Sequence, residues 1–133
     1  LALHRQNSID TDTTSLEHQL SPILTSEDLV ILTRVARQIE VSDEIQSYIV
    51  QLIRASRQHP RIALGASTRA SVALLRISQA YALINNRSYV IPDDVKYLTP
   101  YVLSHRLTLT HMTAPEERFQ LMKDLIQQTA ILT

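Results

Sequence analysis

The chain has 133 residues, 44% of them hydrophobic, and its 13 lysines and arginines balance 13 aspartates and glutamates. A chain of this length and composition builds one domain with a hydrophobic core, and zero net charge gives no argument for a polyanionic partner. The absence of cysteine excludes disulfides and thiol chemistry. Because no apolar run is long enough for a membrane span or a signal peptide, we expect a soluble, cytoplasmic protein.

Residues 1–22 are predicted to be the end of a preceding core domain and a linker. Leu1-Ala2-Leu3 is consistent with the tail of a helix that begins upstream, and the polar residues 7–15 favour a linker. Since the first residue is not methionine, we expect the chain to be an excerpt of a longer protein or a processed piece. The compact domain is then expected to cover residues 23–133.

Two helices are predicted before residue 60. Thr25 and Asp28 approximate a capping box, and apolar residues at helical spacing follow it to about residue 40. Ser42 is a typical N-cap for the second helix, with two acids in its first turn, and Pro60 ends it.

The segment that follows contains the only glycine of the chain, Gly65. A short apolar run, Ile62-Ala63-Leu64, precedes it, and Ser67 is placed to cap a long apolar helix. The pattern predicts an extended stretch, a tight turn at Gly65 and a helix start at Ser67.

Arg69 falls in the first turn of that helix, where a positive charge is unfavourable because the helix N-terminus is itself positive. A helix N-terminus beside an arginine is a place where a phosphate can be held by backbone N–H groups and a forked pair of guanidinium donors. The alternatives are that Arg69 points into solvent or pairs with Asp93 or Asp94. Arg76, two turns further along, either widens a positive stripe or is an ordinary surface arginine.

Arg54 and Arg57 lie near the C-terminal end of their helix. A positive charge stabilises that end of a helix, so these two side chains are interpreted as complementing the helix dipole.

The helix after Ser67 is apolar nearly all round as far as residue 84, which predicts a central position in a helical bundle. Asn85 and Asn86 tolerate left-handed backbone and end it. The β-prone run 89–91 is expected to pair with residues 62–64 as a small two-stranded ribbon.

Pro92-Asp93-Asp94 reads as a helix start, with proline at the first position and two acids in the first turn. An apolar run ending in two aspartates also resembles a Walker B strand, but the helical spacing that follows favours capping. Thr99-Pro100 is expected to break this helix. A last helix is predicted over about 114–130, with Thr113 and Glu116 as its capping box. The fold class is therefore all-α, a bundle of about five helices.

Several kinds of site are excluded. One glycine cannot supply a Walker A loop or a dinucleotide fingerprint. The five histidines lack metal-ligand spacing, so we expect no metal site, and no G-x-S-x-G motif is present. The five tyrosines are interpreted as core or boundary residues. We find no self-sufficient active site.

An ordered series of motifs resembles the C-terminal lid domain of MoxR-family AAA+ ATPases over roughly residues 23–110. The series comprises Tyr48-Ile49-Val50, Arg57-Gln58-His59-Pro60, Gly65-Ala66-Ser67-Thr68-Arg69-Ala70, Arg87 through Val95, and Leu103-Ser104-His105-Arg106-Leu107. The chain departs from the family, which usually has proline at the position of Thr68, glycine at that of Asn86 and often threonine at that of Ile91.

The resemblance implies that Gly65, Ala66, Ser67 and Arg69 form the sensor-2 element, in which Arg69 reaches the phosphates of a nucleotide held by the core domain. It implies ATP and Mg²⁺ in the full-length protein, which would be an ATPase. It implies no cofactor and no hydrolysis for the fragment alone, since the phosphate loop, Walker B, sensor 1 and arginine finger would precede residue 1.

The resemblance also implies partners. These are the protein's own core domain, neighbouring subunits of a ring that is typically hexameric, and von Willebrand factor A domain proteins, in a chaperone-like role that matures or assembles other proteins. Two alternatives remain open from the residues: a helical nucleic-acid-binding module using Arg69 and Arg76, which the zero charge disfavours, and a helical protein-interaction module.

Overall fold

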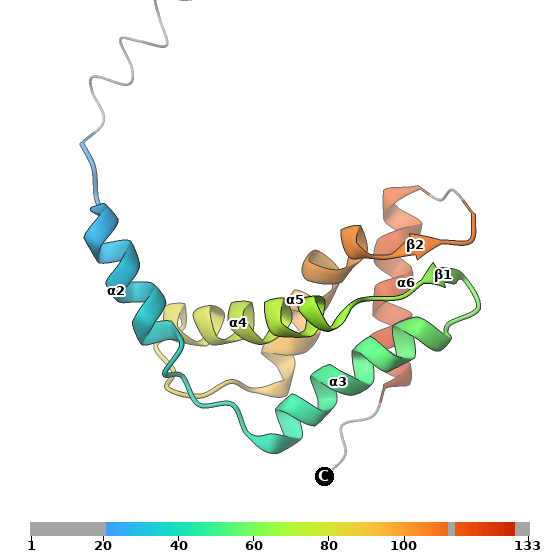
Figure 1. The fold of residues 1–133 in the computed structure, drawn as a ribbon, viewed down its shortest axis with the longest axis horizontal. Helices are drawn as coiled ribbons and strands as arrows, with labels where there is room; N and C mark the ends of the chain where they lie inside the picture. Colours follow the sequence, from blue (N-terminus) through green and yellow to red (C-terminus); the bar gives the residue numbers. More distant parts are fainter. Residues whose placement is uncertain (1–20, 112–113, 130–133) are drawn as a thin grey trace, which may run out of the picture. The chain divides into compact units, whose positions relative to one another are not determined.

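The computed structural model describes residues 21–111 and 114–129. Within these residues it has five α helices and one two-stranded sheet (Figure 1), which confirms the predicted all-α fold with a small ribbon. In chain order the elements are α2 (Ser26–Ala36), α3 (Asp43–Gln58), β1 (Ile62–Leu64), α4 (Thr68–Ile84), α5 (Pro92–Leu103), the 3-10 helix η1 (Ser104–Arg106), β2 (Thr108–Leu109) and α6 (Pro115–Gln128).

The chain divides into two units, with the boundary between Ile31 and Leu32. The expected linker over residues 1–22 lies almost entirely outside the described residues, and so does the capping role of Thr113.

Helix α2 begins at the predicted capping box. The Asp28 amide donates to Thr25 Oγ1 at 3.1 Å, and the Thr25 amide donates to Asp28 Oδ2 at 2.8 Å. The helix ends at Ala36 rather than near residue 40, and none of its residues is buried. The prediction placed its end too late because the apolar spacing continues to Ile39, which is buried but lies beyond the helix.

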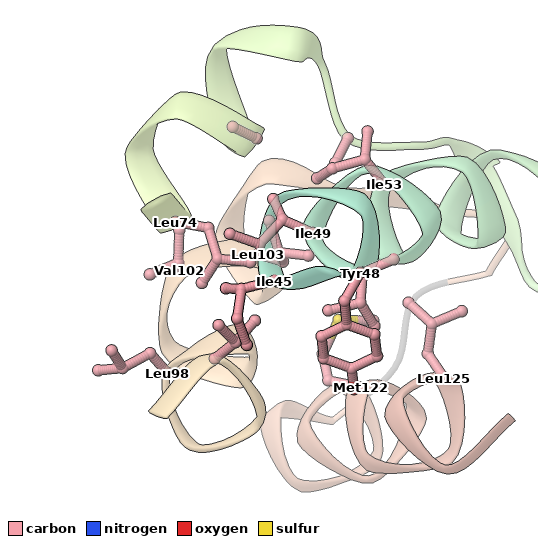
Figure 2. Packing of buried hydrophobic residues seen from close by; sticks show 14 of the residues in the cluster. Ile45, Tyr48, Ile49, Ile53, Leu74, Leu98, Val102, Leu103, Met122 and Leu125 are labelled. Carbon is pink, nitrogen blue, oxygen red and sulfur yellow. The ribbon is translucent and has the colours of Figure 1, made fainter. Parts of the chain in front are cut away.

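Four helices enclose the core. Contacts join α3 to α4, α4 to α5, α5 to α6 and α6 back to α3. Figure 2 shows side chains from all four helices meeting in one apolar cluster. The fully buried side chains at its centre include Tyr48, Leu52, Leu74, Leu103, Met122 and Leu125.

Helix α3 has the predicted ends. The Ser42 hydroxyl accepts from the Ile45 amide at 3.4 Å. The helix stops at Gln58, and His59 is extended because a residue before proline is disfavoured in helical conformation.

Helix α4 is less buried than the sequence predicts. It buries one face, formed by Ala70, Leu74, Ser78, Gln79 and Ala82, while Val72, Ile77 and Ile84 are exposed. The expected burial on nearly all sides is therefore wrong, although Ala73, Leu75, Tyr81 and Leu83 also pack partly buried against the core. Asn86 ends the segment in left-handed backbone, as expected, with φ 55°.

The ribbon forms with a different partner from the one predicted. Strand β1 pairs antiparallel with β2, with Ile62 opposite Leu109 and a local irregularity before Leu64. Tyr89 instead makes an isolated parallel bridge with Glu40. The run 89–91 therefore ties the α4–α5 connection to the chain before α3.

Helix α5 begins as predicted and continues further. The Ile91 amide donates to Asp94 Oδ2 at 3.0 Å, which confirms capping for this carboxylate. The helix includes Pro100 and runs to Leu103, so the predicted break at Thr99-Pro100 is wrong. The Thr99 hydroxyl donates to the Val95 carbonyl at 2.6 Å inside this stretch.

Candidate functional site

The residues that lead into helix α4, Gly65 and Ala66, pack closely against the end of helix α3. A Cβ atom on Gly65 would lie 2.5 Å from Arg57 Cγ, 2.6 Å from Arg57 Cα and 2.7 Å from Arg57 N. Gly65 has no positive φ. The prediction that Gly65 makes a tight turn is therefore wrong. A glycine is needed here because the backbone of Arg57 in α3 lies too close for a Cβ atom.

The next residue, Ala66, is fixed by two hydrogen bonds to helix α3. Its amide donates to Ser56 Oγ at 3.0 Å, and its carbonyl accepts from Arg57 Nε at 2.9 Å. Ser56 and Ala66 are both fully buried, and the Ser56 hydroxyl itself donates to the Ile53 carbonyl at 2.7 Å. The segment before α4 is thus held rigidly on the last turns of α3.

Ser67 occupies the predicted N-cap position of α4. Its backbone is extended, and its carbonyl accepts from the Ala70 amide at 2.9 Å. Its hydroxyl makes no capping hydrogen bond. The N-terminus of α4 therefore begins at the expected residue but without a side chain that satisfies its free N–H groups.

Arg69 is the second residue of α4 and is exposed. Within the described residues no hydrogen bond or ion pair involves its side chain. Of the two aspartates considered as partners, Asp93 pairs with Lys96 at 3.1 Å, and Asp94 pairs with Arg87 at 2.6 Å. The guanidinium is therefore available to an external anion.

Arg76, two turns along α4 from Arg69, is exposed and hydrogen-bonded within its own helix. Its Nη1 donates to Gln79 Oε1 at 3.0 Å. The Gln79 amide in turn donates to the carbonyls of Ile39 at 2.7 Å and Arg37 at 3.3 Å. Through Gln79, Arg76 thus helps to hold the chain before α3.

Two other arginines lie near the start of α4. Arg54 and Arg57 line a hollow of about 200 Å³ together with Thr68 and Ser71 of α4's first turns. Arg57 lies in the last turn of α3, which agrees with its interpretation as a charge that complements the helix dipole. That interpretation did not include the hydrogen bond from Arg57 Nε to the Ala66 carbonyl. No pattern in the sequence predicts a hydrogen bond between residues nine positions apart, such as Arg57 and Ala66. A lone glycine does indicate a position where another part of the backbone lies close.

In the described parts of the chain, no group of three or more histidines, aspartates and glutamates could hold a metal ion. No helix in those parts has both the length and the hydropathy to cross a bilayer.

These features define a class of protein. They describe a helical bundle with one small ribbon that carries a rigidly mounted, exposed arginine at a helix N-terminus. Such an arrangement can bind a phosphate-bearing partner surface and supply positive charge to it.

Comparison with known proteins gives the family. Residues 54–129 match the AAA lid domain. The chain is 34% identical over 108 residues to the chaperone MoxR1 of Mycobacterium tuberculosis, covering 74% of this chain and 29% of that protein. It is 44% identical over 101 residues to the uncharacterized protein YeaC of Bacillus subtilis, covering 76% of this chain and 30% of YeaC.

Two further relatives agree. A magnesium-chelatase subunit ChlI homolog of Methanocaldococcus jannaschii is 30% identical over 103 residues, covering 77% of this chain and 25% of the homolog. The crystal structure of a candidate ATPase from Cytophaga hutchinsonii matches with a TM-score of 0.77 at 26% identity, covering 96% of this chain and 45% of the other. The chain therefore belongs to the AAA lid domain family, and it is a lid of the MoxR type.

The chain spans only a quarter to a third of the length of these curated relatives. What the lid supplies to a larger protein is therefore argued from its own geometry below.

Proposed function

We propose that Arg69 is the sensor-2 residue of an AAA+ ATPase, and that Gly65, Ala66 and Ser67 position it. In the full-length protein its guanidinium contacts the phosphates of ATP, which is bound with Mg²⁺ on the core domain. The observation that carries this proposal is an exposed arginine without a described partner at the positive end of α4.

The mounting of Arg69 supports this role. Electrostatic stabilisation of a transferring phosphoryl group depends on donors that are held in place before the reaction. Arg69 follows directly on a segment fixed by two hydrogen bonds and by the Gly65 contact, so movement of the lid as a whole would move the guanidinium with it. Lid closure would thereby couple nucleotide state to domain position.

Replacing Arg69 tests the proposal. In the full-length protein, Arg69→Ala should lower kcat for ATP hydrolysis by about 10²–10³, the effect of removing one preorganised donor. Arg69→Lys should recover only part of the rate because an ammonium lacks the forked donor geometry.

Two measurements distinguish a catalytic role from a folding defect. Arg69→Ala should not lower the free energy of unfolding of the 133-residue chain, and removing a cation from a helix N-terminus should raise it by about 0.3–1 kcal/mol. Arg106→Ala is the matched control, since Arg106 is also exposed and lies in η1, outside the proposed site. Unchanged hydrolysis by Arg69→Ala would contradict the assignment.

The wider role rests on the family. We propose that residues 23–133 form the lid, that the full-length protein is cytoplasmic and assembles into a ring, and that it acts as a chaperone on other proteins. Von Willebrand factor A domain proteins are the proposed partners. The similarity to the chaperone MoxR1 supports this role. Native mass measurement of the full-length protein with ATP should show a ring, and a monomer under those conditions would contradict it.

A further inference from the structure

Four aromatic rings from helices α4, α5 and α6 contact one another in a row. Tyr81 of α4 contacts Tyr97 of α5 with ring centroids 5.4 Å apart. Tyr97 contacts Tyr101 at 5.5 Å, and Tyr101 contacts Phe119 of α6 at 5.5 Å. Although they are packed in this row, Tyr97 and Tyr101 remain 53% and 55% exposed. The row therefore presents a continuous aromatic surface to solvent.

Three rings of this row, those of Tyr97, Tyr101 and Phe119, line a groove of about 430 Å³ between α5 and α6. Lys96 and Lys123 line the same groove. These are the only two lysines among the 133 residues, and no aspartate or glutamate lines the groove. In a chain without net charge, this groove therefore combines aromatic side chains with two positive charges.

Both lysines are accessible to an incoming carboxylate. Lys96 pairs with Asp93 at 3.1 Å, but the two side chains are 42% and 80% exposed, and such surface pairs exchange readily. Lys123 Nζ lies 5.4 Å from the Phe119 ring centroid. Within the described residues no carboxylate pairs with Lys123.

We propose that this groove, lined by aromatic residues and lysines, binds an acidic segment of a partner protein. An apolar side chain of that segment packs on Tyr97, Tyr101 and Phe119, and carboxylates on either side of it pair with Lys96 and Lys123. Aromatic residues supply most of the contact area in such interfaces, while complementary charge sets specificity and the rate of association.

The ring geometry favours a protein segment over single-stranded nucleic acid. Bases stack on free ring faces along a positive track. Here the rings lie against one another, tilted by 32°, 53° and 71°. Two lysines in a chain of zero net charge also give little counterion release.

The test uses the 133-residue chain and three probes of defined sequence. The first is the hexapeptide Asp-Asp-Leu-Phe-Asp-Asp, the second is the same peptide with asparagine in place of aspartate, and the third is an oligothymidylate. Titration of the acidic peptide to about 1 mM, a range suited to weak single-segment binding, should shift the NMR signals of Tyr97, Tyr101, Phe119 and Lys123 saturably. The asparagine peptide should bind at least about fivefold more weakly.

Variants localise the binding. Lys123→Glu should weaken binding of the acidic peptide by about tenfold or more, because it places a like charge beside the ligand. Arg54→Glu makes the same change of charge on α3, outside this groove, and should leave the affinity within about twofold. Equal binding of the two peptides, tighter binding of the oligothymidylate, or no shift at the groove would each overturn the proposal.

Discussion

At the residue scale, Gly65 allows the segment before Arg69 to pack directly on α3, which holds Arg69 in position. A methyl group there would meet Arg57 Cα at 2.6 Å and Arg57 N at 2.7 Å. Backbone atoms cannot move aside by a change of rotamer, so any larger residue must separate α3 from the segment before α4. The hydrogen bonds between Ala66 and the end of α3 would lengthen with it.

Gly65→Ala is therefore expected to lower the free energy of unfolding by about 1–3 kcal/mol, as overpacking does. Chemical denaturation of the 133-residue chain measures this. Ser67→Ala is the control at a neighbouring position: because the Ser67 hydroxyl makes no capping hydrogen bond, its loss should cost less than about 0.5 kcal/mol. A Gly65→Ala chain as stable as the parent would show that the close approach is relieved at no cost.

Local signals in the sequence predict where α4 begins but not the contacts that support this end of the helix. Ser67 stands at the N-cap position and Arg69 in the first turn, as predicted, whereas the Ser67 hydroxyl makes no capping bond and Gly65 has no positive φ. Ser56 and Arg57 act through bonds across nine or ten residues. Such contacts depend on how α3 and β1 fold back on each other, which no local pattern specifies.

At the element scale, an ion pair joins the α4–α5 connection to the start of α5. Arg87 donates two hydrogen bonds to Asp94, at 2.6 and 2.7 Å, and a third to the Tyr89 carbonyl at 3.1 Å. The Asp94 side chain is 4% exposed and that of Arg87 is 23% exposed. The hydrogen bond to Asp94 raises the pKa of Arg87, so the guanidinium stays charged throughout the physiological range.

Asp94→Asn should remove the ion pair with Arg87 while keeping the hydrogen bond that caps α5. Asparagine can still accept from the Ile91 amide, but it leaves the Arg87 guanidinium without its counter-charge. We expect a loss of about 1–3 kcal/mol in the free energy of unfolding, measured by chemical denaturation. Asp93→Asn makes the same chemical change at a side chain that is 80% exposed and should cost less than about 0.5 kcal/mol. Equal losses for the two variants would contradict a structural role for the pair.

Helix boundaries were predictable where a cap specifies them, and strand pairing was not. The starts of α2, α3 and α5 follow from Thr25, Ser42 and Pro92, whose side chains act within one helical turn. Strand β1 pairs with β2 because the chain, after α5 and η1, returns to lie beside β1. Both candidate partners are short and β-prone, so propensity alone does not distinguish them.

At the scale of the whole molecule, the described part of the four-helix core contains one buried side-chain polar group without a hydrogen-bond partner. Tyr48 is fully buried, and in the described structure its hydroxyl has no hydrogen-bond partner. Burial, and then the negative charge of Asp93, raise the pKa of Tyr48 above its ordinary value of 10.0. The ring fills space beside Met122 and Leu125 (Figure 2), so the hydroxyl adds a desolvation cost to otherwise favourable packing.

Tyr48→Phe is expected to raise the free energy of unfolding by about 0.5–2 kcal/mol at neutral pH, because it removes an unpaired buried hydroxyl and keeps the ring. The difference should grow in alkali. A phenol with a higher pKa in the folded chain stabilises folding fully below the unfolded value of 10.0 and loses that contribution as the pH rises above it.

Thermal unfolding of both chains between neutral pH and pH values above 10.0 measures this difference. Tyr89→Phe is the matched control, since Tyr89 is 53% exposed and the same substitution there should leave the neutral melting temperature unchanged. A less stable Tyr48→Phe chain would show that the Tyr48 hydroxyl is satisfied by a buried water and contributes to the core.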